Sequence, residues 1–207
     1  MERYLKAGSS FLCRQYAPHV LVMFLFCCMS GFFVSLRNLD ALQAAKVMEM
    51  YFAFTGILLF TPLFMPEQDM DIFLLKRSKA MPLWRLYLIR LLEAVTLLTL
   101  VITVFILLMK QGGCVFSARN LWLGAFAEIL FLGSIGYFVS AVTNQVVLGY
   151  MVSIIYFISN IGASKHLGIF GLFQMMRGEY GFAPVMLLAA AILAVVGIVI
   201  REKRAWS

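Results

Sequence analysis

The residues whose types suit catalysis or metal binding are few, and their spacing argues against both. Ser134 lies in the small-residue run Gly133-Ser134-Ile135-Gly136, a setting in which a serine nucleophile can occur. A nucleophile needs a base within hydrogen-bond reach, and His19 and His166 fall near opposite ends of the apolar runs, away from Ser134. The four cysteines match no metal-site spacing. The sequence therefore predicts a chain that is not an enzyme and binds no metal or cofactor itself.

Besides Glu49 near the start of the run 47–65, two acidic residues fall inside long apolar runs, where an ionisable side chain is a candidate for function. Glu93 follows Arg90 by three residues, so we expect an ion pair on one helix face, with a proton relay as the alternative. Glu128 lies about seven residues inside its run, roughly 10 Å deep at 1.5 Å per residue. Its side chain is predicted either to bond a packed helix or to line a cavity or cargo path, and both interpretations remain open.

A stripe of polar side chains follows one face of the run 146–163. Its members fall within about 120° of a helix circumference and are Tyr150, Ser153, Tyr156, Asn160 and Ser164. Hydrogen bonds between packed helices would explain such a stripe, and so would the lining of a cargo path. These residues and Glu128 are the candidate pathway or helix-interface residues.

Composition identifies the elements that must position these side chains as membrane helices. The 207 residues are 63% hydrophobic and 13% charged, with a mean hydropathy of +0.93, whereas soluble domains are roughly 45–50% apolar. A membrane span needs about 20 mostly apolar residues. Six runs meet this requirement: 18–36, 47–65, 88–109, 121–142, 146–163 and 182–200. The predicted fold is therefore all-α, a single transmembrane domain over 1–207 with six spans.

Three segments between or before the spans have patterns of their own. Residues 1–17 are amphipathic with basic residues on the polar side, which predicts a helix lying flat at the membrane surface. Residues 165–181 are apolar but too short to span and are interrupted by Gly168, Gly171 and Gly178, which predicts a re-entrant segment. Residues 66–87 form a charged loop.

The distribution of basic residues predicts the orientation. With the N-terminus inside, 11 of the 17 Lys and Arg residues fall on the cytoplasmic side, which predicts an inner-membrane protein with both termini cytoplasmic. Cys114 would then be the only cysteine facing out. The net charge of +7 gathers at the ends of apolar runs, so the lipid bilayer is the expected partner and nucleic acid is not.

The stretch from Pro66 to Arg90 is the only long charged segment between the apolar runs. Its acidic residues come first and its basic residues follow, an order that suits a short helix beginning at Pro66 because acids stabilise a helix N-terminus. An apolar cluster lies between them: Ile72, Phe73, Leu74 and Leu75. A loop this short cannot bury that cluster alone, which predicts a soluble partner.

This stretch resembles the coupling segment in the permeases of ABC-type exporters of the type V fold. The resemblance rests on Glu67, on 72–75, on the run Arg77-Ser78-Lys79-Ala80-Met81-Pro82, and on 86–90 at the foot of the third span. Arg90 occupies the place of the family's lysine, and Asp69-Met70-Asp71 replaces its commoner Gly-Thr. The layout of a flat N-terminal helix, six spans and a re-entrant segment before the last span is also similar to that family.

The resemblance implies a cytoplasmic coupling helix that docks on a separate ATPase. The expected coupling residues are Glu67, Asp71, Ile72, Phe73, Leu74, Leu75 and Arg77. The chain contains no G-x-x-x-x-G-K-[ST] phosphate loop, so ATP and Mg²⁺ would bind to two copies of an ABC ATPase subunit. The permease would pair with a second copy or with a similar permease and export a peptide, lipid-like or drug-like cargo. The alternative is a non-transporting membrane scaffold or immunity protein.

Overall fold

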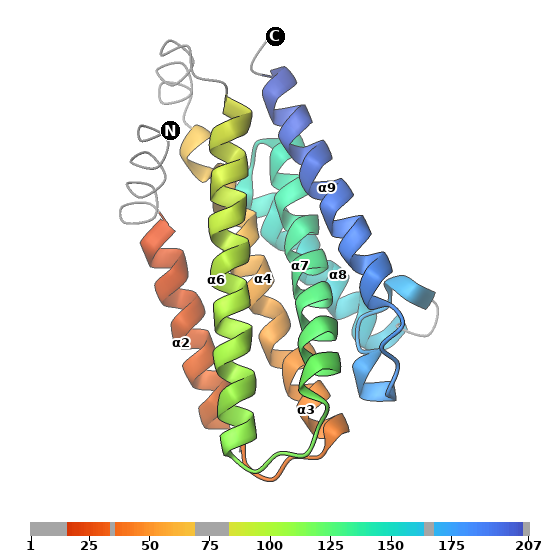
Figure 1. Cartoon of the computed structure of the whole chain (residues 1–207). Coiled ribbons are helices and arrows are strands. Elements are labelled where there is room, and N and C mark those ends of the chain that lie inside the picture. The colour runs from red at the N-terminus through yellow and green to blue at the C-terminus, as the bar shows by residue number, and fades with distance from the viewer. Residues whose placement is uncertain (1–15, 34–35, 69–82, 164–167, 205–207) are drawn as a thin grey trace.

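The computed structural model describes residues 16–33, 36–68, 83–163 and 168–204, which form an elongated bundle of helices (Figure 1). Each of the six apolar runs corresponds to helical structure. Five of them are single helices: α2 (Ala17–Phe33), α6 (Leu83–Gln111), α7 (Ala118–Thr143), α8 (Val146–Ala163) and α9 (Ala183–Arg204). The predicted surface helix lies almost wholly outside the described residues, as does most of the predicted coupling loop. The predicted loop ends too late, because α6 already begins at Leu83.

The second apolar run is one continuous rod, Ala41–Glu67, whose helical pitch changes along its length. Its parts are α3 (Ala41–Val47), a π-helical turn η2 (Met48–Phe52), α4 (Ala53–Phe60) and a 3-10 helix η3 (Thr61–Glu67). The α-helix gives way to the 3-10 helix at Thr61-Pro62, because proline has no N–H for the α-helical bond. Pro66 lies inside η3, so the prediction that it opens a new helix is wrong.

Four helical stretches are long and apolar enough to cross a membrane: Ala41–Glu67, Leu83–Gln111, Ala118–Thr143 and Ala183–Lys203. Together they make this an all-α protein of the multi-pass membrane type. The other two, Ala17–Met29 within α2 and Val146–Gly162 within α8, are shorter apolar helices.

Helix α7 lies at the centre of the bundle and packs against α4, α6, α8 and α9 (Figure 1). Glycine makes the closest of these approaches possible. A Cβ added to Gly136 would lie 2.3 Å from Thr61 Oγ1 and 2.7 Å from Ser153 Oγ, and one added to Gly149 would lie 2.6 Å from Gly136 O. The small residues of α7 therefore allow other helices to approach it closely.

The bundle has two ends with different polar structure (Figure 1). At the end that we call the coupling end, η3 and α7 finish, α6 and α8 begin and α9 terminates. The opposite end carries α3, the 112–117 turn, and the segment 168–182 with its 3-10 turns η4 (Gly168–Phe170) and η5 (Met175–Arg177). Cys114 lies at this opposite end, where it is buried and its Sγ donates to Leu36 O at 3.3 Å.

Candidate functional site

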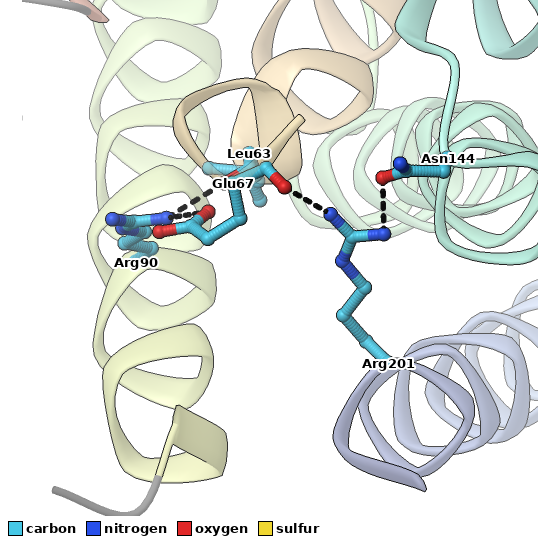
Figure 2. Close-up of polar contacts among 5 residues, drawn as sticks. All are labelled: Leu63, Glu67, Arg90, Asn144 and Arg201. Atoms are coloured by element: carbon cyan, nitrogen blue, oxygen red, sulfur yellow. Dashed lines mark hydrogen bonds and ion pairs between the residues drawn. The ribbon is translucent and has the colours of Figure 1, made fainter. Parts of the chain in front are cut away.

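The coupling end holds a buried ion pair between two helices. Glu67 and Arg90 are 2% exposed each, and Arg90 Nη1 donates to Glu67 Oε2 at 2.8 Å and to Leu63 O at 3.1 Å (Figure 2). The pair joins the last turn of η3 to α6. An arginine that bonds both a carboxylate and a carbonyl oxygen holds the helix end in position and also neutralises the charge of the carboxylate.

A second arginine approaches the same turn from α9. Arg201 Nη2 donates to Glu67 O at 2.8 Å, and Arg201 Nη1 bonds Asn144 Oδ1 (Figure 2). Asn144 ends α7 in the left-handed conformation, with φ of 60°, which asparagine tolerates. Gln68 Nε2 donates to Asn144 O at 3.0 Å. The last turn of η3 is thus tied to α6, to the end of α7 and to α9.

These contacts change two sequence-based expectations. Arg90 was expected to pair with Glu93 along its own helix; it does interact electrostatically with Glu93, but its hydrogen-bonded ion pair is with Glu67 on η3. Glu67 is an expected ATPase-docking residue, but its carboxylate points into the bundle and is used there. The other expected coupling residues, Asp71, Ile72, Phe73, Leu74, Leu75 and Arg77, lie outside the described residues.

A second polar cluster lies at the opposite end and consists of side chains that bond the backbone of 168–182. Glu49 on η2 accepts the N–H groups of Met175 at 2.6 Å and Met176 at 3.0 Å. Glu128 Oε1 on α7 accepts Phe173 N–H at 3.3 Å. Both carboxyl groups belong to side chains that are 1% exposed. Two helices therefore supply the acceptors for three backbone N–H groups of one irregular segment.

Helix α8 adds two more of these contacts. Asn160 Oδ1 accepts Leu172 N–H at 2.8 Å, and its Nδ2 donates to Tyr156 O at 2.8 Å. The Tyr156 hydroxyl donates to Phe170 O at 2.5 Å. Within the segment itself, Gln174 Nε2 donates to Gly168 O and Gly171 O. The segment therefore keeps its backbone groups bonded without a regular helix, as an irregular stretch must when protein surrounds it.

No family model, curated protein or solved structure matches this chain. The functional argument therefore rests on the two clusters and on the pattern of the sequence.

The structure brings together only some of the candidate pathway residues. Glu128, Tyr156 and Asn160 all bond the 168–182 segment, although the first is on α7 and the others are on α8. Ser153 is fully buried beside Gly136, where α7 and α8 touch, and Tyr150 is half-buried. Ser164 lies outside the described residues. Within the stripe, Ser153 thus belongs to the contact between α7 and α8, whereas Tyr156 and Asn160 bond the 168–182 segment.

Ser134 is explained by local structure. Its hydroxyl donates to Phe131 O of the preceding turn at 2.7 Å, a common bond for a serine within a helix. In the described part of the chain no group of three or more His, Cys, Asp or Glu side chains could hold a metal ion.

Sequence reasoning gave no role to three residues that prove central. Glu49 was treated only as the start of a span, although an acid that close to an apolar run is itself a signal. Arg201 is one of the basic residues at the ends of the apolar runs that were expected to meet lipid, whereas it is 4% exposed and bonds Asn144 and Glu67. Asn144 between two runs has the residue type of a helix C-cap, which was the available signal.

Proposed function

We propose that this chain is the membrane-spanning permease subunit of an ATP-driven ABC exporter, energised by a separate ATPase. The four long apolar helices would be joined by α2 and α8 to give six spans. The excess of Lys and Arg at the coupling end favours an inner-membrane topology with both termini in the cytoplasm. Residues 69–82 then form the cytoplasmic loop on which the ATPase docks.

The observation that carries this proposal is the network around the last turn of η3. Glu67 stands directly before the loop, and its side chain and carbonyl oxygen bind Arg90 of α6 and Arg201 of α9. Breaking a buried, hydrogen-bonded ion pair costs about 3–5 kcal/mol, so a displacement of the loop would move these helices rather than tear the network. A loop that only anchored the protein in the membrane would not need such connections.

A non-transporting membrane scaffold is the second candidate, and one observation favours it. Three residues expected to line a cargo path, Glu128, Tyr156 and Asn160, instead bond the backbone of 168–182. Helix α8 nevertheless keeps one face for another molecule, because Met151, Ile155 and Ile158 are more than half exposed. We assign this face to lipid and to a second permease, either identical or similar.

The test distinguishes docking of the ATPase on the loop from transmission of the loop's displacement to the helices. The double variant Phe73→Ser with Leu74→Ser should remove apolar contact worth about 25 cal/mol per Å² buried. When this variant is purified from its native membranes, the permease should still be inserted but should no longer retain an ATPase that has a phosphate loop. Glu67→Gln, outside the docking surface, should retain the ATPase but lower transport per ATP hydrolysed in proteoliposomes.

Arg85→Gln is the matched control, because Arg85 is an exposed arginine of α6. It should change neither ATPase retention nor transport. If the double serine variant keeps both ATPase and transport, the loop is not the coupling element and the exporter proposal fails. If no ATPase accompanies the unaltered chain, the scaffold function is supported instead.

A further inference from the structure

Glu49 and Glu128 differ in how their oxygens are used. Both oxygens of Glu49 accept backbone N–H groups, from Met175 and Met176. Only Oε1 of Glu128 accepts one, and the bond to Phe173 N–H is long at 3.3 Å. Glu128 Oε2 is buried and accepts no hydrogen bond from a donor group of the described residues, and the side chain that Glu128 meets there is the carboxyl group of Glu49. An ionised carboxylate oxygen buried without a donor is strongly disfavoured, whereas a protonated one can itself donate.

The surroundings offer little positive charge to the two carboxyl groups. They interact with each other, and the charged or titratable side chains that face them are Arg177 on η5, Tyr180 beyond it and Tyr156 on α8. Arg177 is exposed and interacts with Glu49. Burial, and then the neighbouring Glu49, raise the pKa of the Tyr180 phenol, so it stays neutral below its ordinary value of about 10. Among the residues that the structure describes, one exposed guanidinium, that of Arg177, thus interacts with this pair of buried carboxyl groups.

Two carboxyl groups that share a buried site cannot both ionise readily. The one with more N–H donors keeps the negative charge, which here is Glu49 because both of its oxygens accept backbone N–H groups. The other keeps the proton, and the unbonded Oε2 of Glu128 is the atom to carry it.

We propose that Glu49 and Glu128 form a proton-binding site that holds one proton, on Glu128, while the 168–182 segment is docked on the helices. Loss of that proton leaves two negative charges against one exposed arginine and releases the segment. The site is thus a pH-sensitive latch at the opposite end of the bundle. It depends on the contacts of 168–182 alone, so it stands whether or not the chain is an exporter.

The difference in bound protons between the docked and open states determines how docking of the segment depends on pH. The docked state binds one more proton than the open state, in which water can solvate both carboxylates, so docking is favoured at low pH and weakens as pH rises. From the pH at which a water-exposed glutamic acid ionises, about 4.3, up to the pH at which the docked site gives up its proton, the docking equilibrium should fall about tenfold per pH unit, and above that it should level off.

The experiment is hydrogen–deuterium exchange of the full chain in lipid nanodiscs, from about pH 5 to about pH 9, the range in which a buried glutamic acid titrates. Rates at Leu172 to Met176 are corrected for intrinsic exchange and divided by those of 112–117, an irregular stretch at the same end of the bundle. Protection of 172–176 should fall with rising pH in the unaltered chain.

Two isosteric variants decide between the carboxyl groups. Glu128→Gln supplies a neutral donor in place of the protonated acid, so protection should stay high and become independent of pH. Glu49→Gln replaces one acceptor oxygen by an NH₂ group facing an N–H donor, so protection should be low at every pH. A flat pH profile for the unaltered chain, or equal loss of protection in both variants, would overturn the proposal. Unchanged protection of α7 in both variants excludes general unfolding.

Discussion

Each of the two polar clusters bonds backbone groups of a short 3-10 helix, and the side chains that do so have opposite charges. At the coupling end a 3-10 helix finishes, and arginines bond two of its carbonyl oxygens: that of Leu63, whose 3-10 partner Pro66 has no N–H, and that of the last residue, Glu67. At the opposite end another 3-10 helix begins, and Glu49 accepts its first N–H groups, those of Met175 and Met176. Helix ends expose unbonded carbonyl groups at one terminus and unbonded N–H groups at the other, with matching partial charges. The sign of each cluster therefore follows from which end of the short helix it holds.

The two clusters also differ in how their contacts respond to pH. Arginine stays protonated at any physiological pH, so its bonds to the carbonyl oxygens of Leu63 and Glu67 cannot be switched by a proton. Glutamic acid can gain or lose one. On the two proposals made above, the coupling end transmits displacement and the opposite end responds to protonation, and substitutions in the two clusters should show this contrast.

The largest effect is expected at the coupling end, for Arg90→Met. The change leaves the Glu67 carboxylate, whose side chain is fully inaccessible, without its cation, and an uncompensated buried charge costs about 3–5 kcal/mol. Denaturant unfolding of the purified protein in detergent should show a loss of that order.

The double variant Arg90→Met with Glu67→Gln should recover much of this loss, because it removes the orphaned charge along with its partner. Arg85→Gln, at an exposed arginine of the same helix, should be nearly neutral. A loss below about 1 kcal/mol for Arg90→Met would mean that water reaches Glu67 and that the pair is a surface contact.

The sequence was sufficient to predict the helices because hydrophobicity over about 20 residues is a local property. The six runs all coincide with helical structure, and the glycines of α7 mark its contacts. The special role of 165–181 was also visible, since glycines interrupt an apolar stretch too short to span. Its described part contains two 3-10 helices, and the re-entrant path remains a prediction.

The partners of the polar residues could not be predicted, because they depend on which helices become neighbours. Arg90 was assigned to Glu93 by its spacing along one helix, but the chain places Glu67 opposite it. The π-helical turn around Glu49 and the inward direction of Arg201 have no local signal of comparable strength. Helical periodicity shows which face of a helix is polar and does not show what that face meets.

A smaller effect is expected at the opposite end, for Asn160→Leu. Leucine leaves Leu172 N–H without its acceptor in a buried position, which costs about 1–3 kcal/mol. The loss should appear as faster hydrogen exchange in 168–182, while the coupling end stays protected. Ile161→Leu, at an exposed neighbouring position, is the control and should change nothing. Equal exchange in both variants would show that the segment does not depend on Asn160, and the cargo-path role would regain support.

The smallest effect is expected for Tyr156→Phe, and its size reports on what surrounds the segment. Phenylalanine keeps the edge-on contact with Phe131, at 5.9 Å between ring centroids, and removes only the hydroxyl that donates to Phe170 O. This bond is exposed, so in water the freed carbonyl is rehydrated and the loss should be about 0.5–1.5 kcal/mol, below that of Asn160→Leu. In the hydrocarbon of a membrane no water replaces the hydroxyl, and an unbonded carbonyl costs several kcal/mol. Exchange rates of 168–182 in nanodiscs therefore measure where the segment lies. A loss that matches or exceeds that of Asn160→Leu would place Phe170 within the lipid and make the segment re-entrant, whereas a smaller loss would place it at the aqueous surface.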